Sequence, residues 1–188
     1  MASRAEQKAA TRTRIVSAAA RLFRERGYHG IGLDAIMAAA GLTHGGFYAH
    51  FPNKEALFEA VIGLDYGLGR QMRLRRDIPG GGDLALDYYL DPEHLAEIGR
   101  DCPFVNLLPD VTRVGGRAPD TFQSAFDALL GEFEFLVPEG AKDARERALV
   151  AATLTLGAVI LAKAVRPELA GQLLRAAREG VRVVLRGQ

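Results

Sequence analysis

The sequence has few of the features that indicate secretion, a membrane span or an oxidising environment. Cys102 is the only cysteine, so an internal disulfide is excluded and a reducing compartment is expected. Residues 1–14 lack the apolar core of a signal peptide. The most apolar run, residues 148–162, has fifteen residues, whereas a membrane span needs about 20. These absences predict a cytoplasmic protein that is not held in a membrane.

Sequence motifs of the common catalytic and metal sites are also missing. The chain contains no GxxxxGK[ST], HExxH, GxSxG or CxxC pattern. Glu132 and Glu134 are two residues apart on an expected helix and therefore diverge. His44 and His50 are six apart and do not share a helix face, which disfavours a metal site. We therefore expect no enzyme activity, no cofactor and no metal.

Charge is unevenly distributed along the chain. The net formal charge of the 188 residues is only +1. Residues 1–57 contain 8 Lys/Arg and 4 Asp/Glu, a balance of +4, whereas the remainder contains 16 and 19, a balance of −3. A basic N-terminal part on an acidic remainder suggests that the N-terminal part meets a polyanion.

Periodicity predicts an all-α fold of about nine helices. Apolar residues recur at i, i+3 and i+4, no segment alternates as a strand would, and no internal repeat is present. Gly27, Gly41 and Pro52 fit helix ends, and the segments 78–83 and 115–119 fit loops. The expected helices cover residues 9–26, 33–40, 44–50, 54–77, 84–90, 104–114, 120–137, 142–165 and 168–185.

The segment GLTHGGFYAHFPNK, residues 41–54, carries the strongest functional signal. A helix, Gly41-Leu42-Thr43 and a second short helix have the spacing of a helix-turn-helix motif, whose second helix enters the DNA major groove. Gly45 and Gly46 would let the backbone approach the groove, at a cost of about 1 kcal/mol each in helix propensity. Hydroxyl, imidazole and ammonium groups are usual phosphate partners, and this segment supplies them at Thr43, Tyr48, His50 and Lys54.

Two longer stretches then resemble a known family. TRTRIVSAAARLFRERGY and LDAIMAAAGLTHGGFYAHFPNKEALFEAVI closely resemble the DNA-binding domain of the tetracycline-repressor (TetR/AcrR) family of bacterial transcription regulators, over about residues 11–62. The resemblance implies a homodimer with a three-helix DNA-binding domain at residues 1–52. It implies a ligand-binding and dimerisation domain at residues 53–188, joined through a linking helix at 53–77.

The resemblance also assigns roles to individual residues. Thr43, Tyr48, His50 and Lys54 match positions that contact the DNA backbone. His44, Gly45 and Gly46 occupy the base-reading stretch, and Phe47 and Phe51 match hydrophobic anchors. Gly32 departs from the pattern, because the family usually has Ser or Thr before the second helix. One phosphate contact in each subunit is therefore in doubt.

In the remainder of the chain the resemblance is weaker. YYLDPEHLAEIGRDCPFVNLLPDV is similar to a segment of one subgroup that precedes a pocket helix. The residues 142–165 and 168–185 are similar to the final two helices, which in the family form a four-helix bundle between subunits. A pocket lined by aromatic and a few polar side chains is expected to hold an unknown small-molecule effector. Its candidate residues are Tyr88, Tyr89, His94, Cys102, Phe104, Asn106, Phe122 and Phe126.

Cys102 leaves two interpretations open. The first is a small buried hydrophobe. The second is a thiol that senses oxidants or electrophiles, because a helix beginning at Pro103 would favour the thiolate. Arg100 would lower the thiol pKa, whereas Asp101 would raise it.

The sequence as a whole therefore predicts a ligand-released transcriptional repressor. It would bind a palindromic double-stranded DNA operator as a homodimer, without a membrane partner. The alternative function is a small-molecule or thiol-redox sensor, acting through Cys102, whose DNA binding is weak or vestigial.

Overall fold

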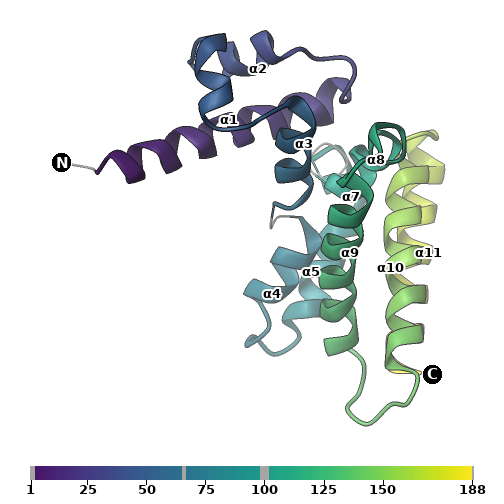
Figure 1. The fold of residues 1–188 in the computed structure, drawn as a ribbon. Coiled ribbons are helices and arrows are strands. Elements are labelled where there is room, and N and C mark those ends of the chain that lie inside the picture. The colour runs from purple at the N-terminus through teal and green to yellow at the C-terminus, as the bar shows by residue number, and fades with distance from the viewer. Residues whose placement is uncertain (1–2, 65–66, 98–101, 188) are drawn as a thin grey trace. The chain divides into compact units, whose positions relative to one another are not determined.

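The computed structural model describes residues 3–64, 67–97 and 102–187, and it contains no strand within these ranges. The all-α prediction is confirmed. The chain forms two compact units (Figure 1). We call Met1–Leu64 together with Asn106–Gln123 the head unit, and Asp65–Val105 together with Ser124–Gln188 the body unit.

The head unit contains five helices and the first residues of a sixth. They are α1 (Arg4–Arg26), α2 (Leu33–Ala39), the 3₁₀ helix η1 (His44–Ala49), α3 (Lys54–Ile62), α8 (Leu108–Val114) and the start of α9 (Ala118–Phe135). The apolar stripe of α1 predicted from the sequence is buried, with Ile15, Ala19 and Phe23 fully enclosed. Phe23 and Phe58 meet edge to face, with ring centroids 5.4 Å apart. This aromatic contact joins α1 to α3.

Two boundaries in the head unit differ from the prediction. Helix α1 begins at Arg4 rather than near residue 9, because Ser3 and Glu6 form a reciprocal capping box. The linking helix expected over residues 53–77 is two helices, α3 and α4 (Leu68–Leu74). Gly63 is the C-cap residue of α3. Gly67 is the N-cap residue of α4, and its φ of +75° is a conformation that only glycine adopts easily.

The body unit holds the remaining helices. They are α4, α5 (Gly81–Tyr89), the 3₁₀ helix η2 (Pro92–His94), α7 (Pro103–Asn106, its last residue in the head unit), the rest of α9, α10 (Ala144–Ala162) and α11 (Pro167–Arg186). The glycine run predicted as loop at 78–83 is partly helical, since α5 starts at Gly81. The single helix predicted over 104–114 is interrupted at Leu107 and forms α7 and α8. The helices predicted at 142–165 and 168–185 are confirmed as α10 and α11.

Helices α10 and α11 lie side by side and antiparallel in the body unit (Figure 1). Ala151, Ala152 and Ala158 of α10 are buried within the single chain. These small side chains therefore pack inside one copy of the chain. Arg145 of α10 reaches Asp127 and Glu134 of α9, at 2.7 and 3.0 Å. These ion pairs fasten α9 against α10.

In the described ranges, no helix combines the length and the apolar character that crossing a membrane requires.

Candidate nucleic-acid interface

The turn between α2 and η1 is fixed by backbone hydrogen bonds and by α1. The N–H of Leu42 donates to the carbonyl of Met37 at 2.9 Å, and Arg14 donates to the carbonyl of Ala40 at 2.6 Å. Gly41 has φ of +67°, and a Cβ there would lie 2.9 Å from the Arg14 guanidinium. The left-handed conformation therefore favours glycine here, and a Cβ would also push the end of the Arg14 side chain away from the Ala40 carbonyl. The turn presents η1 in a defined orientation on α1 and α2.

Thr43 is the N-cap residue of η1, as predicted, with the extended backbone typical of that position. Its side chain makes no capping hydrogen bond and is exposed. The Thr43 hydroxyl is therefore not used in capping η1.

Gly45 and Gly46 differ from Gly41, because the fold itself does not demand glycine there. A Cβ at Gly45 would meet no atom within 4 Å, and one at Gly46 would meet only the Met37 Cε at 3.8 Å. Neither residue has a positive φ. Alanine would therefore fit both positions and would favour the helix. Nothing within 4 Å in the described structure therefore requires glycine at either position.

His44 and Tyr48 lie on the exposed side of η1. Tyr48 is 61 % exposed, and its ring centroid lies 6.1 Å from that of His44. The Nδ1 of His44 pairs with the carboxylate of Asp34 in α2, at 2.5 Å. This pairing orients the imidazole and leaves Nε2 on the other side of the ring. Phe47 and Phe51 are buried, as expected of hydrophobic anchors.

His50 and Lys54 are directed into the protein more than the sequence suggested. The Nδ1 of His50 is buried and has no hydrogen-bond partner among the described residues. The Lys54 ammonium donates to the carbonyls of Tyr28 and Ile31, both at 2.5 Å, and lies 4.3 Å from the Tyr28 ring centroid. Burial lowers the pKa of Lys54, and the carboxylates of Glu55 and Asp110 oppose this effect. Lys54 therefore ties α3 to the loop after α1, and a phosphate contact by this residue stays a prediction.

Gly32 begins α2 without a side-chain cap, as its lack of a hydroxyl predicts. A Cβ at Gly32 would meet nothing within 4 Å, and its φ of −92° suits any residue. The departure from the family pattern is therefore not imposed by the fold.

Sequence reasoning missed three residues that shape this surface. Asp34 pairs with His44, Arg14 holds the turn, and the Arg12 guanidinium lies 4.6 Å from the centre of the Phe51 ring. The sequence alone assigned no role to Arg12 or Arg14. Their partners lie 26 or more residues away in the sequence, so no local pattern could have paired them.

The residues proposed to line an effector pocket are divided between the two units. Asn106 and Phe122 belong to the head unit, and the other six belong to the body unit. Tyr88 is exposed, stacks on His94 with ring centroids 3.9 Å apart, and donates to Glu97 at 3.0 Å. Phe104 and Phe126 meet edge to face at 5.9 Å. A pocket lined by the whole set stays a prediction.

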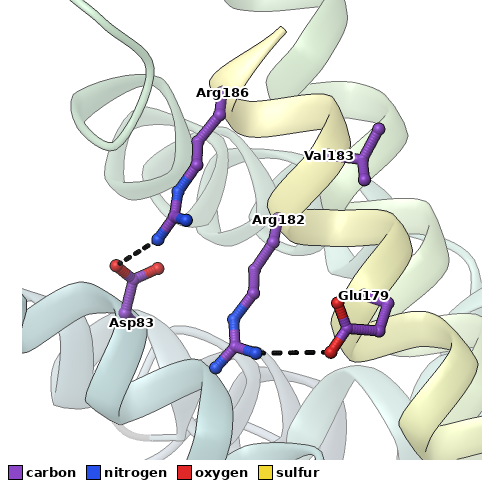
Figure 2. Close-up of a pocket in the computed structure, with 5 residues that line it drawn as sticks. All are labelled: Asp83, Glu179, Arg182, Val183 and Arg186. Atoms are coloured by element: carbon purple, nitrogen blue, oxygen red, sulfur yellow. Dashed lines mark hydrogen bonds and ion pairs between the residues drawn. The ribbon is translucent and has the colours of Figure 1, made fainter. Parts of the chain in front are cut away.

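Two surface hollows of the body unit are lined by other residues. One is bordered by Asp83, Glu179, Arg182, Val183 and Arg186 (Figure 2). Its charges compensate one another, since Arg186 pairs with Asp83 at 3.4 Å and Arg182 pairs with Glu179 at 3.5 Å and Asp87 at 2.7 Å. The other is bordered by Met72, residues 76–83, Glu132, Phe135 and Leu136. Glu132 is buried there and pairs with Arg73 and Arg76, both at 2.7 Å.

Cys102 is only 2 % exposed and accepts a hydrogen bond from the Tyr89 hydroxyl at 2.7 Å. Burial raises the pKa of the Cys102 thiol, whereas the Tyr89 hydroxyl, the N–H groups of Val105 and Phe104 and the Lys163 charge lower it. Burial prevails, so the neutral thiol is favoured. Helix α7 does begin at Pro103, as predicted. Arg100 and Asp101 lie outside the described residues.

Comparisons with known proteins agree with this geometry. The profile of "Bacterial regulatory proteins, tetR family" matches residues 15–61. The transcriptional regulator UidR of Escherichia coli K12 is 44 % identical over 52 residues, which are 28 % of this chain and 26 % of UidR. The chain thus spans about a quarter of the length of this relative, and that match concerns the head unit alone.

Solved structures extend the likeness to the whole fold. The reduced form of NemR from E. coli superimposes with a TM-score of 0.73, at 22 % identity, over 92 % of this chain and 95 % of NemR. FadR of Bacillus subtilis, solved in complex with stearoyl-CoA, gives a TM-score of 0.66 at 16 % identity, over 94 % and 98 % of the two chains. A helix-turn-helix head with an all-helical body is the class of protein that the fold defines. Residues 15–61 thus match the tetR family of bacterial regulatory proteins, and over the rest of the chain the likeness is one of fold.

Proposed function

We propose that this protein is a DNA-binding transcriptional regulator and that it acts as a ligand-released repressor. The observation that carries the proposal is the pair Gly45 and Gly46 on an exposed element. The fold leaves room for a side chain at both positions, and both glycines weaken a helix. Glycine at these two positions would let the backbone of η1 come close to the edges of the base pairs.

The side chains around the two glycines support the same function. Thr43 and Tyr48 supply exposed hydroxyl groups, which suit phosphate oxygens. His44, oriented by Asp34, supplies a ring nitrogen that suits a base edge. The net charge of +4 over residues 1–57 would attract the DNA backbone.

A homodimer formed through α10 and α11 completes the proposal. Both helices carry exposed apolar side chains, which a body of this size normally buries. On α11, Leu169, Leu173, Ala176, Gly180 and Val183 recur with alternating spacings of four and three, and all are at least partly exposed. On α10 the exposed apolar residues are Leu149, Val150, Leu154, Ile160 and Leu161. A two-fold dimer would place two η1 elements for a palindromic operator.

Release by a small molecule is the remaining part of the proposal. FadR, which shares the fold, was solved with stearoyl-CoA, and an effector of unknown identity is proposed to bind the body unit of this chain. Effector and DNA would then weaken each other's binding by the same factor. A site in the cytoplasm, where the DNA lies, follows from this function.

Fluorescence anisotropy tests the proposal. A duplex selected from a random library by the wild-type protein is labelled and titrated at two salt concentrations. We expect tight binding that falls steeply with salt and resists competitor DNA. If no sequence is enriched, and binding to all duplexes is equally weak, the function in DNA recognition is wrong.

The alternative of a thiol sensor finds less support than the DNA-binding function. Burial of Cys102 and its contact with Tyr89 favour an unreactive thiol. The alternative requires that oxidant weakens DNA binding of the wild type but not of Cys102→Ser.

A further inference from the structure

Helix α1 begins well before it reaches the core of the head unit. Its first buried residue is Ile15, and residues 3–10 are all exposed. Figure 1 shows these first turns, in purple, projecting beyond α2 and α3. Residues 4–14 are eleven positions, or about 16 Å of helix at 1.5 Å per residue. Most of this length adds nothing to the buried core.

The projecting segment is nevertheless built as a stable helix. The Ser3 N–H donates to the Glu6 carboxylate at 2.6 Å, and the Glu6 N–H donates to the Ser3 hydroxyl at 3.2 Å. Ala, Arg, Lys, Gln and Glu, which favour helices, fill positions 4–10. Because packing does not hold these turns, the capping box and the local propensities must do so.

The exposed segment carries basic residues at helical spacing. Arg4, Lys8 and Arg12 follow one another at i, i+4 and i+8, and therefore lie along one side of α1. Glu6 is the only acidic residue in positions 4–14, and its carboxylate is used in the capping box. The positive charge of the segment is thus left without a partner carboxylate of its own.

The last residue of this basic side, Arg12, contacts the segment just after η1. The Arg12 guanidinium lies over the ring of Phe51, two residues beyond the end of η1. Arg14, two residues further on, donates to the carbonyl of Ala40 in the turn before η1. The segment therefore extends outward from the motif itself.

We propose that residues 3–14 form an arm that binds the DNA phosphate backbone beside the site read by η1. The inference rests on the proposed function and adds a second contact to it. Phosphates on one strand are about 3.4 Å apart along the axis, so an arm of about 16 Å would span roughly five base pairs. Arg4 and Lys8 would contribute affinity and not base preference, since phosphates carry no sequence information.

The test compares duplexes with and without flanking DNA. The selected site is prepared as its core alone and with eight base pairs added on each side, and both are titrated with full-length protein. Wild type should prefer the longer duplex several-fold. Arg4→Ala/Lys8→Ala should bind the two duplexes equally, and its salt dependence should be shallower by about two in log–log slope for each bound copy.

A matched control removes the same charge from elsewhere in the head unit. Arg21 and Arg117 are both exposed, so Arg21→Ala/Arg117→Ala should keep the preference for flanks. If the arm variant also keeps the preference and the slope, the arm is only a solvated helix end and the inference is wrong. The inference is also wrong if sedimentation shows that the arm variant no longer dimerises, because the arm then contacts a second copy of the chain and not DNA. Failure of wild type to select any site would instead overturn the proposed function.

Discussion

The carboxylate of Asp110 accepts a hydrogen bond of 2.7 Å from the backbone N–H of Tyr28, although 82 positions separate them in the sequence. Asp110 is 7 % exposed, and Gly27 leaves room for it, since a Cβ there would lie 3.3 Å from its Oδ2. Helix α8 is thereby fixed to the C-terminal end of α1 inside the head unit. The same loop is held from the other side by Lys54.

Removal of the Asp110 carboxylate should destabilise the head unit. Asp110→Ala leaves the buried N–H of Tyr28 without a partner, which costs about 1–3 kcal/mol. Thermal unfolding should show the loss as a lower midpoint. Asp110→Asn keeps an acceptor oxygen and should recover part of the stability. Equal stability of the alanine variant and wild type would contradict the importance of this bond.

Alanine at Gly46 should separate stability from DNA binding. Because a Cβ fits and helix propensity improves, Gly46→Ala should be neutral or stabilising by up to about 1 kcal/mol. Anisotropy with the selected duplex should nevertheless show at least tenfold weaker binding. Gly131→Ala in α9 is a matched control, since a Cβ there also meets nothing within 4 Å. It should leave DNA binding unchanged.

The Gly32→Ser variant should be more stable than wild type and should bind DNA more tightly. The hydroxyl can cap α2 and add a few tenths of a kcal/mol to the free energy of unfolding. It would also restore the phosphate contact that the family pattern provides, so DNA binding should tighten. Gly32→Ala offers no hydroxyl and should not tighten binding. A looser complex with Gly32→Ser would show that DNA does not approach this end of α2.

Loss of Asp34 should change specificity more than affinity. Without the carboxylate, the His44 ring is no longer oriented, so preference at the base it reads should relax. Removing an exposed negative charge should at the same time strengthen binding to random DNA. Both effects reduce the ratio of specific to non-specific affinity. Selection from a random library with Asp34→Ala measures the first effect, and anisotropy with random duplexes measures the second.

Cys102 should react slowly with thiol reagents in the folded protein. Its raised pKa leaves less thiolate at pH 8 than a free cysteine has, and burial hinders access. Release of the chromophore from a disulfide reagent should be much slower in buffer than in denaturant. Tyr89→Phe removes one hydrogen bond that lowers the thiol pKa, so it should not accelerate the reaction. Rapid modification of native wild type would favour the sensor hypothesis.

The sequence predicted those parts of the molecule that depend on local patterns. The buried face of α1, the turn at Gly41 and the approximate extents of α10 and α11 follow from spacing and helix-ending residues, whereas the pairing of α10 with α11 was implied by the family resemblance. Contacts across the sequence could not be predicted in this way. The Lys54 ammonium donates to two carbonyls more than twenty residues earlier, which local spacing does not indicate, and its phosphate contact stays a prediction. The sequence predicted one long helix across Gly63 and Gly67. The break at these glycines depends on their backbone angles, which the sequence does not give.

The grouping of residues 106–123 with the head unit has a consequence for synthesis on the ribosome. Leu107 and Val111 are part of the same buried cluster as Phe23 and Phe58. Translation must therefore pass well beyond Leu64 before this cluster can close, which takes a few seconds at about 5–20 residues per second. During that interval the apolar side chains that Leu107 and Val111 would cover stay accessible. A nascent chain that stops before residue 107 carries η1 on a cluster that lacks Leu107, Val111 and Ala118.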